Sequence, residues 1–369
     1  MKILIVTELL APYRVAWFDE LGKNSEVTIL YTKEKEISRD DKWLSLKPKN
    51  CKVKKLKEFN FLRLNLCFGV INELKRDYDI ILLDGYGFST QILAILYLKL
   101  IRKDFFMNID GGLIKENENF IKKYIKKFFI KSPSYYLSSS KTTDMYLEYY
   151  GANTNNIYHH NFTSIYSDEI LKKVLSNDEK KQLKDKLGVK DDKVIISVGR
   201  FIKTKGFDVL IKAANLLDQK CTVYIIGGIP TKDYLKLIND EQIKNVKFLE
   251  FKEKDELKNY YKIADLFVLP TRGDVWGLVI NEAMACGLPV ITTNKCVAGL
   301  ELIENYKNGF IVEVDNKEIL AEKISEIITN DNLKNEIAKN NLKKIRDYTI
   351  ENLAKSHIDL FKKYLNKNI

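Results

Sequence analysis

The chain has 369 residues, more than one ordinary hydrophobic core accommodates, so we expect two domains. Its 45% hydrophobic and 30% charged residues are typical of globular proteins. No apolar run approaches the ~18 residues that span a bilayer. The five cysteines include no CxxC pair, which predicts reduced thiols and no zinc site. The net charge of +11 favours anionic partners (phosphates, an acidic membrane surface or nucleic acid), although a general lysine and asparagine bias explains the excess equally well.

The N-terminal half alternates apolar strands with helical patterns. We expect strands at residues 2–7, 26–31, 78–84 and 105–110, and a helix that begins at Pro12. This alternation predicts a doubly wound parallel sheet. We expect a buried strand rather than a signal peptide at the start, because Glu8 interrupts the apolar run and no small-residue cleavage site follows. The turn after the first strand lacks G-x-G-x-x-G, which disfavours a classical dinucleotide site.

Two short patterns in this half are candidates for a ligand site. The strand at 105–110 ends in Asp110, and Gly111 and Gly112 follow, which lets a ligand approach the backbone, although a simple turn has the same pattern. His159 and His160 occupy adjacent strand positions, which point to opposite faces, so at most one of them faces a cleft. Two histidines without a third ligand make a poor metal site, and we expect structural or surface roles.

Residues 120–131 have the pattern of an amphipathic helix. Its apolar stripe consists of Phe120, Ile121, Tyr124, Ile125, Phe128 and Phe129, and its other side carries Lys122, Lys123, Lys126, Lys127 and Lys131. One interpretation is a helix that lies on an anionic membrane surface. The other is a helix that packs on the domain core and exposes a lysine face to solvent.

The second half repeats the α/β pattern. Residues 167–187 are charged and helical and form the linker region, and strands are expected from residue 193 onward. We place the domains at residues 1–168 and 169–348, with a terminal helix at 349–369 that crosses back to the first domain.

The stretch from 269 to 293 organises this second domain. It predicts a strand end, a loop, a buried helix from Gly277, and a helix end at Gly287. Asp274 in the loop and Glu282 in the helix bracket the turn. Open α/β sheets bind ligands at the carboxyl ends of their strands, and a helix N-terminus there presents free N–H groups to an anion.

A second loop of the same domain carries cations. The strand at 193–199 ends in Gly199, and Arg200 and Lys205 follow it, a combination suited to a diphosphate. An anion flanked by two carboxylates that can bind hydroxyl groups indicates a sugar nucleotide.

In this order, residues 197–206, 264–270, 274–290, 298–301 and 308–309 resemble the motifs of the family 4 retaining glycosyltransferases. The resemblance is strongest over residues 190–315. It implies the GT-B architecture, in which two Rossmann-like domains with doubly wound parallel sheets face each other across a cleft. It also implies that the N-terminal domain binds the acceptor and the C-terminal domain binds the nucleotide-sugar donor.

The resemblance assigns roles in donor binding. The family pattern is Glu, seven residues, Glu; here Asp274 occupies the first position and Glu282 the second. The family implies that Glu282 binds the ribose hydroxyls and that Asp274, one methylene shorter than glutamate, contacts the transferred sugar. The implied diphosphate ligands are Arg200 and Lys205. The donor-binding set is Gly199, Arg200, Lys205, Asp274, Gly277, Leu278, Val279 and Glu282.

The N-terminal half departs from the family. Many relatives have a histidine at the end of an N-terminal strand, and Asp110 occupies the comparable place. The glycine pair usual in the first loop is replaced by residues 9–14, where Arg14 either points to the donor phosphate or acceptor or lies on the surface. Arg14, Gly111 and Gly112 are therefore the candidates for the acceptor side.

The function implied is a metal-independent, retaining transfer of a hexosyl or N-acetylhexosaminyl unit from a nucleotide diphosphate sugar, with UDP-sugar favoured. The expected catalytic residues are Asp274, Arg200, Lys205 and Asp110. The expected acceptor is a glycan or lipid-linked glycan in bacterial cell-envelope or capsular polysaccharide or glycolipid synthesis. We expect no cofactor, no metal and no nucleic-acid partner. The expected location is cytoplasmic, peripheral on the inner face of the plasma membrane through helix 120–131.

Two alternatives stay open. A GT-B-fold sugar-nucleotide epimerase or phosphorylase would use the same nucleotide site. A non-catalytic protein that binds anionic polymers would account for the charge of +11 and would bind nucleic acid in a salt-dependent way, but it leaves the pair Asp274 and Glu282 unexplained.

Overall fold

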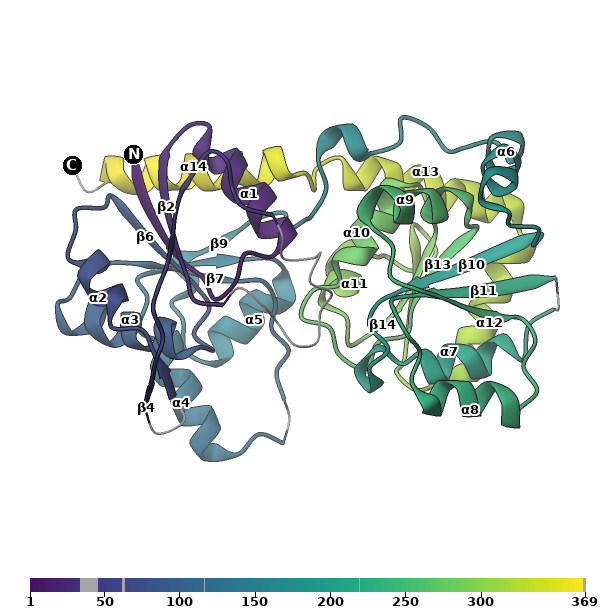
Figure 1. Ribbon diagram of the computed structural model, residues 1–369, viewed down its shortest axis with the longest axis horizontal. Coiled ribbons are helices and arrows are strands. Elements are labelled where there is room, and N and C mark those ends of the chain that lie inside the picture. The colour runs from purple at the N-terminus through teal and green to yellow at the C-terminus, as the bar shows by residue number, and fades with distance from the viewer. Residues whose placement is uncertain (34–45, 62–63, 116, 219, 368–369) are drawn as a thin grey trace. The chain divides into compact units, whose positions relative to one another are not determined.

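The computed structural model describes residues 1–33, 46–61, 64–115, 117–218 and 220–367 (Figure 1). The chain forms two compact units. The N-terminal unit comprises residues 1–164 together with 349–369, and the C-terminal unit comprises residues 165–348. Each unit has one parallel sheet with helices packed on it, so the predicted class of two doubly wound α/β domains is confirmed.

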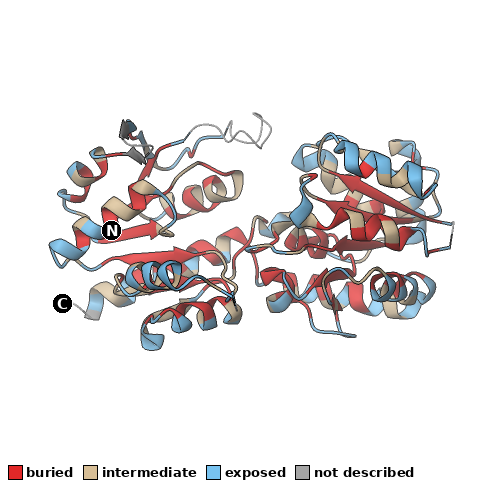
Figure 2. Ribbon diagram, turned by 90° about the horizontal axis from the view of Figure 1, so that it is seen from below, coloured by how far each residue is buried: buried red, intermediate tan, exposed pale blue. Residues whose placement is uncertain are grey.

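The N-terminal unit is built on seven parallel strands in the order β3-β2-β1-β6-β7-β8-β9. The strands are β1 (Lys2–Val6), β2 (Glu26–Tyr31), β3 (Lys52–Lys55), β6 (Ile80–Asp84), β7 (Phe106–Ile109), β8 (Tyr135–Ser138) and β9 (Ile157–His159), and a separate antiparallel pair is β4 (Phe59–Phe61) with β5 (Leu64–Leu66). In the centre, Ile5 pairs with Ile29 on one side and Leu82 on the other. These apolar strands are buried, as the red strands of Figure 2 show.

The helices of this unit are α1 (Pro12–Gly22), α2 (Gly69–Leu74), α3 (Ser89–Leu100), α4 (Phe120–Ile130), α5 (Lys141–Tyr149) and α14 (Ile350–Lys367). The C-terminal helix α14 packs on α1 and on the sheet through aromatic contacts. The ring centroids of Trp17 and His357 are 4.8 Å apart, and those of Phe106 and Phe361 are 5.1 Å apart. The last helix of the chain is therefore part of the N-terminal unit.

Two buried histidines make the stability of this unit depend on pH. Burial, the largest effect, lowers the pKa of His357 to about 4, although its hydrogen bond to the Leu353 carbonyl acts in the opposite direction. Burial also lowers the pKa of His160 well below its usual value. Unfolded histidine takes up a proton near pH 6.5, so the stability contribution is complete above that pH and is lost as the pH falls towards 4.

For His357 alone this loss is on the order of 3 kcal/mol. About 2 kcal/mol of this loss falls between pH 7 and pH 5, and urea unfolding at about those two pH values measures it. A His357→Phe variant keeps ring contacts with Trp17 and Phe361 but cannot titrate, so its stability should fall less over that interval. An equal fall in the wild type and the variant would contradict this explanation.

The C-terminal unit has six parallel strands in the order β12-β11-β10-β13-β14-β15. The strands are β10 (Lys193–Val198), β11 (Cys221–Ile226), β12 (Val246–Leu249), β13 (Leu266–Leu269), β14 (Val290–Thr293) and β15 (Gly309–Val312). The helices are α6 (Asn177–Leu187), α7 (Phe207–Ala214), α8 (Lys232–Asp240), α9 (Lys254–Ile263), α10 (Leu278–Ala285), α11 (Val297–Leu302), α12 (Lys317–Thr329) and α13 (Asp331–Ile345). A short 3-10 turn, η4 (Lys203–Lys205), precedes α7.

Helix α4 exposes its apolar stripe. Phe120 is 77% exposed, Tyr124 75%, Ile121 54% and Ile125 48%, and Ile130 is the one fully buried residue of the helix. Only Phe129 of the stripe packs against the core, so the interpretation that the stripe as a whole packs on the domain core is wrong. Helix α4 lies at the periphery of the N-terminal unit, where it is labelled in Figure 1.

Among the described residues, no helix combines the length and hydropathy that crossing a bilayer requires.

Candidate functional site

In the C-terminal unit the strand order changes direction at β10. The chain runs from β10 to β11 and β12 on one side, and then returns to β13, which pairs with the other side of β10. In a doubly wound sheet this switch leaves a crevice at the carboxyl ends of the two adjacent strands, where ligands bind. The loop after β10 (199–206) and the loop after β13 (270–277) follow the carboxyl ends of these two strands, and seven of the eight predicted donor residues lie on them or in the first turn of α10.

The two loops meet in an ion pair between Lys205 and Asp274. Lys205 Nζ lies 2.5 Å from Asp274 Oδ2, and each side chain is 17% exposed. The Lys205 side chain extends across Gly199, since its Cδ and Cε lie 3.5 Å from the point that a Cβ on Gly199 would occupy. Arg200 follows Gly199 and is half-buried. The structure thus brings Gly199 and Lys205 of one loop together with Asp274, which lies 69 positions after Lys205 in the sequence.

The N-terminus of α10 begins beside Asp274. Gly277 is the N-cap with a φ of +106°, and a Cβ there would lie 2.9 Å from the Cys296 sulfur, so the position needs glycine. The same point is 3.8 Å from Asp274 Oδ2. Leu278 and Val279 open the helix and are half-buried. Free N–H groups of a helix N-terminus, a lysine and a carboxylate therefore occur within one small region.

Glu282 lies one turn further along α10 and is held by a tyrosine. Tyr261 of α9 donates a hydrogen bond of 3.1 Å from its hydroxyl to Glu282 Oε2. Burial, followed by the negative charge of Glu282, raises the pKa of Tyr261 well above its usual value, so this hydroxyl stays a donor. Tyr261 is a residue that the sequence reading missed, because a tyrosine in a helical apolar stripe looks like any core residue.

The N-terminal unit has its own switch point, between β1 and β6, with a buried ion-pair cluster. Arg14 of α1 lies 2.6 Å from Asp84 at the end of β6 and 2.6 Å from Asp110 after β7. The three side chains are 11%, 7% and 15% exposed, respectively, and Thr7 after β1 donates to Asp84 at 2.8 Å. The alternative of a surface arginine is therefore wrong for Arg14, and Asp84 joins the candidate residues.

Asn108 fixes the geometry of this cluster. Its Nδ2 donates to Asp84 Oδ1 at 3.1 Å and to Asp110 Oδ1 at 2.8 Å, which leaves its Oδ1 to accept from His160 Nε2 at 3.2 Å. Two carboxylates share one guanidinium, so the cluster has an excess of negative charge. Burial raises the pKa of Asp110 to about 6, although the positive charge of Arg14 acts against that rise. Asp110 can therefore hold or release a proton near neutral pH.

The remaining sequence candidates of this unit have simpler explanations. A Cβ on Gly112 would lie 2.5 Å from the Tyr146 ring, so packing explains that glycine without a ligand, and Gly111 is half-buried beside it. His159 Nε2 lies 2.5 Å from Asp144 Oδ2, separate from the cluster that His160 joins. Within the described part of the chain, no three His, Cys, Asp or Glu side chains form a group that could hold a metal ion.

Residues 178–344 match the family model described as glycosyl transferases group 1. An uncharacterized glycosyltransferase of Methanocaldococcus jannaschii is 33% identical over 195 residues, which cover 51% of this chain and 50% of that protein. CapM of Staphylococcus aureus, a capsular polysaccharide biosynthesis glycosyltransferase, is 32% identical over 166 residues, 42% of each chain.

The fold has close matches over almost the whole chain. HepE of Anabaena, solved in complex with UDP and glucose, superposes with a TM-score of 0.77 at 19% sequence identity, and the match covers 98% of this chain and 100% of that one. Two parallel-sheet α/β units with this likeness define the GT-B class of folds. Residues 178–344, just under half of the chain, are similar to the glycosyl transferases group 1, in agreement with the resemblance drawn from the motifs of that segment. The matched segments span about half the length of the curated relatives.

Proposed function

We propose that this protein is a retaining glycosyltransferase that moves a hexosyl or N-acetylhexosaminyl unit from a nucleotide diphosphate sugar, UDP-sugar favoured, to a glycan or lipid-linked glycan acceptor of the bacterial cell envelope. The observation that carries the proposal is the Lys205–Asp274 ion pair beside the N-terminus of α10, at the switch point of the C-terminal sheet. A cation and free N–H groups suit a diphosphate, and a neighbouring carboxylate suits sugar hydroxyls.

In the proposed reaction the bond between the anomeric carbon and the diphosphate oxygen breaks, and a bond from the acceptor oxygen to that carbon forms on the same face. The proton of the acceptor hydroxyl passes to the leaving phosphate. Negative charge develops on the diphosphate, and Arg200, Lys205 and the first N–H groups of α10 stabilise it, with no divalent metal in the mechanism. Lys205 exchanges its partner Asp274 for phosphate, which releases the carboxylate to bind the sugar.

On the acceptor side we assign the cluster of the N-terminal unit. Asp110, with its pKa raised to about 6, is the carboxylate that binds the acceptor hydroxyl. Arg14 and Asp84 hold its position through the 2.6 Å contacts that they share. The similarity to CapM supports a polysaccharide acceptor.

The proposal is tested with purified protein and a panel of UDP-, GDP- and ADP-sugars. Thermal shift identifies the nucleotide, and product analysis with envelope glycans then follows transfer with EDTA present. We expect one base to be preferred, transfer with retention of anomeric configuration, and no loss of activity in EDTA. Conversion of the sugar nucleotide without any acceptor would favour an epimerase, and the absence of nucleotide binding would contradict the proposal.

Glu282 should govern affinity for the nucleoside. We expect Glu282→Gln to weaken UDP binding about 10-fold or more, because bound ribose hydroxyls lose a charged acceptor. Tyr261→Phe removes the 3.1 Å hydrogen bond that orients Glu282 and should weaken UDP binding by a smaller factor. Calorimetry measures both. The control is Glu322→Gln, at an exposed glutamate of α12, and it should not change UDP affinity. Unchanged UDP affinity in Glu282→Gln would contradict the proposal that Glu282 binds the ribose.

We also propose that α4 docks the protein on an anionic lipid surface, as a peripheral protein of the cytoplasmic face. The apolar stripe of α4 stands exposed, and Lys122 and Lys127 flank it. Lys99 of α3 lies 4.3 Å from the centre of the Phe128 ring, so cationic and aromatic groups interleave on this face. An apolar stripe bordered by lysines matches acyl chains under anionic headgroups, and a lipid-linked acceptor would be met there.

Vesicle sedimentation tests this partner. The protein should bind phosphatidylcholine vesicles that contain phosphatidylglycerol, bind phosphatidylcholine alone more weakly, and dissociate in high salt. Each lysine near the surface contributes about 1 kcal/mol, so Lys122→Gln with Lys127→Gln should weaken binding roughly 10- to 30-fold. The matched control replaces Lys232 and Lys236 of α8 with glutamine. Equal binding by both double variants, or self-association through α4 in sedimentation velocity, would contradict the proposal.

A further inference from the structure

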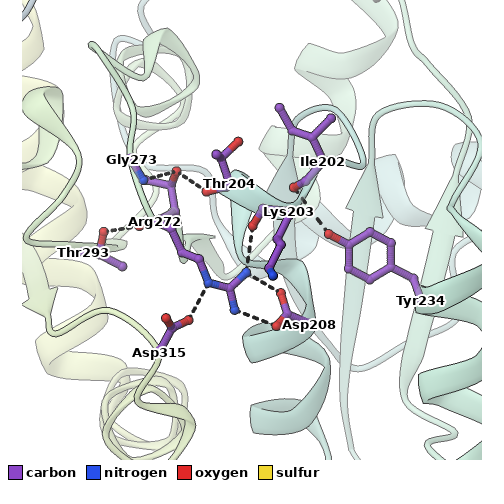
Figure 3. A network of polar contacts seen from close by, with 10 residues as sticks. Ile202, Lys203, Thr204, Asp208, Tyr234, Arg272, Gly273, Thr293 and Asp315 are labelled. Carbon is purple, nitrogen blue, oxygen red and sulfur yellow. Dashed lines mark hydrogen bonds and ion pairs between the residues drawn. The ribbon is translucent and has the colours of Figure 1, made fainter. Parts of the chain in front are cut away.

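Arg272 is a residue of the β13 loop that the proposed reaction does not use. Its side chain is 21% exposed and each of its three nitrogens donates to the protein (Figure 3). Nη1 and Nη2 bind the carboxylate of Asp208 at 2.9 and 2.6 Å, and Nε binds Asp315 at 2.6 Å. Such a two-pronged contact depends on the planar guanidinium, which lysine lacks.

Asp208 on α7 is the carboxylate partner of Arg272. Burial would raise its pKa, but the hydrogen bonds and positive charge of Arg272 outweigh that effect and lower the pKa. The pair therefore stays ionised, and its bidentate geometry holds the first turn of α7 against the β13 loop. Asp315, more than half exposed, adds a third point of attachment after β15.

The same loop is attached directly to the turn that carries Lys205. Arg272 Nη1 donates to the Lys203 carbonyl at 2.7 Å, and the Arg272 backbone N–H donates to the Thr204 carbonyl at 2.7 Å (Figure 3). The Thr271 hydroxyl donates to the same Thr204 carbonyl at 2.8 Å. These contacts hold Lys203 and Thr204 in place, and Lys205, which is assigned to bind the diphosphate, follows them directly.

At Gly206, directly after Lys205, the two loops are in close backbone contact. A Cβ on Gly206 would lie 1.9 Å from the Pro270 carbonyl oxygen, so the two loops touch at the backbone. On the other side of the turn, Tyr234 donates a longer hydrogen bond of 3.4 Å to the Ile202 carbonyl. Besides the Lys205–Asp274 ion pair, Arg272 thus links the loop with Asp274 to the turn that carries Lys205 and to the first turn of α7.

We infer that Arg272 is a positioning residue for the diphosphate: through Asp208 and the Lys203 carbonyl it sets where Lys205 stands relative to Asp274. This inference rests on the proposed function. A displacement of a reacting or binding group by about 1 Å costs on the order of 100-fold in a preorganised site, so the position of Lys205 decides how much the second phosphate adds to affinity.

The readout is the ratio of UDP to UMP affinity, measured by calorimetry. Wild type should bind UDP more tightly than UMP. In Arg272→Lys, which keeps the charge but loses the bidentate contact, UMP affinity should stay near the wild-type value while the gain from the second phosphate falls about 10-fold. Asp208→Asn keeps Arg272 but breaks the pair, and it should lose the same gain if Arg272→Lys folds poorly. Arg76→Lys, in the N-terminal unit, is the control.

The outcomes separate the two proposals. If wild type gains nothing from the second phosphate with uridine, guanosine or adenosine nucleotides, the proposed function fails and the inference fails with it. If wild type shows the gain and both Arg272→Lys and Asp208→Asn retain it, the proposed function stands and the positioning role is overturned. A parallel loss of UDP and UMP affinity would mean a structural role only and would also overturn it.

Discussion

Lys205→Ala is expected to lower glycosyl transfer by about 10²- to 10³-fold, roughly 2.7–4 kcal/mol of transition-state stabilisation. The lysine is poised beside Asp274 at 2.5 Å, and in the proposed reaction it neutralises charge that grows on the leaving diphosphate. Steady-state kinetics with the preferred donor measures the loss, and we expect kcat to fall more than donor affinity.

The matched control for this substitution is Lys203→Ala. Lys203 lies in the same η4 turn, its side chain is exposed, and it serves the turn through its backbone carbonyl. Its removal takes away an equal charge from the same segment and should leave transfer within a few-fold of wild type. Similar losses in both variants would mean that the overall positive charge, and not the position of Lys205, matters.

Asp110→Asn is expected to lower kcat about 10²- to 10⁴-fold while UDP affinity stays unchanged. The substitution keeps the shape of the side chain and removes the carboxylate that faces Arg14. Since the folded pKa of Asp110 is raised to about 6, the wild type should also lose activity as the pH falls through about 6 and the carboxylate takes up its proton.

Asp104→Asn, at an exposed carboxylate of the same unit, is the control and should be nearly neutral. The pH profile distinguishes the proposed role from a structural one, because the acid limb near pH 6 should disappear in Asp110→Asn. A variant with wild-type kcat, or one that retains the same acid limb, would exclude Asp110 from the reaction.

Most of the fold could be predicted from the sequence because the central strands are apolar on both faces. Runs such as residues 193–198 and 266–269 have few alternatives to a buried parallel strand. The edge strand β3 (Lys52–Lys55) was not predicted, since three of its four residues are lysines and carry no apolar signal. Helix α4 was found in the right place, but periodicity does not reveal whether a stripe meets a core or stays exposed.

Site residues could be predicted from the sequence where the residue type and its distance from a strand end or motif already indicate the role. Lys205 and Asp274 are 69 positions apart, yet strand-end positions and family motifs placed them on facing loops. The residues that were missed act through side-chain contacts that only the folded chain creates. Asp84 ends an apolar strand, a signal that was available, whereas nothing in the sequence pairs Arg272 with Asp208 or Tyr261 with Glu282.

Calorimetric titration of UDP into wild type, Lys205→Ala and Asp274→Asn tests the central claim most directly. If Lys205 binds the diphosphate and Asp274 the transferred sugar, UDP affinity should fall at least 10-fold in Lys205→Ala. In Asp274→Asn it should stay equal or increase, because the lysine no longer has to leave its 2.5 Å partner. Unchanged UDP affinity in Lys205→Ala, or an equal loss in both variants, would contradict the account.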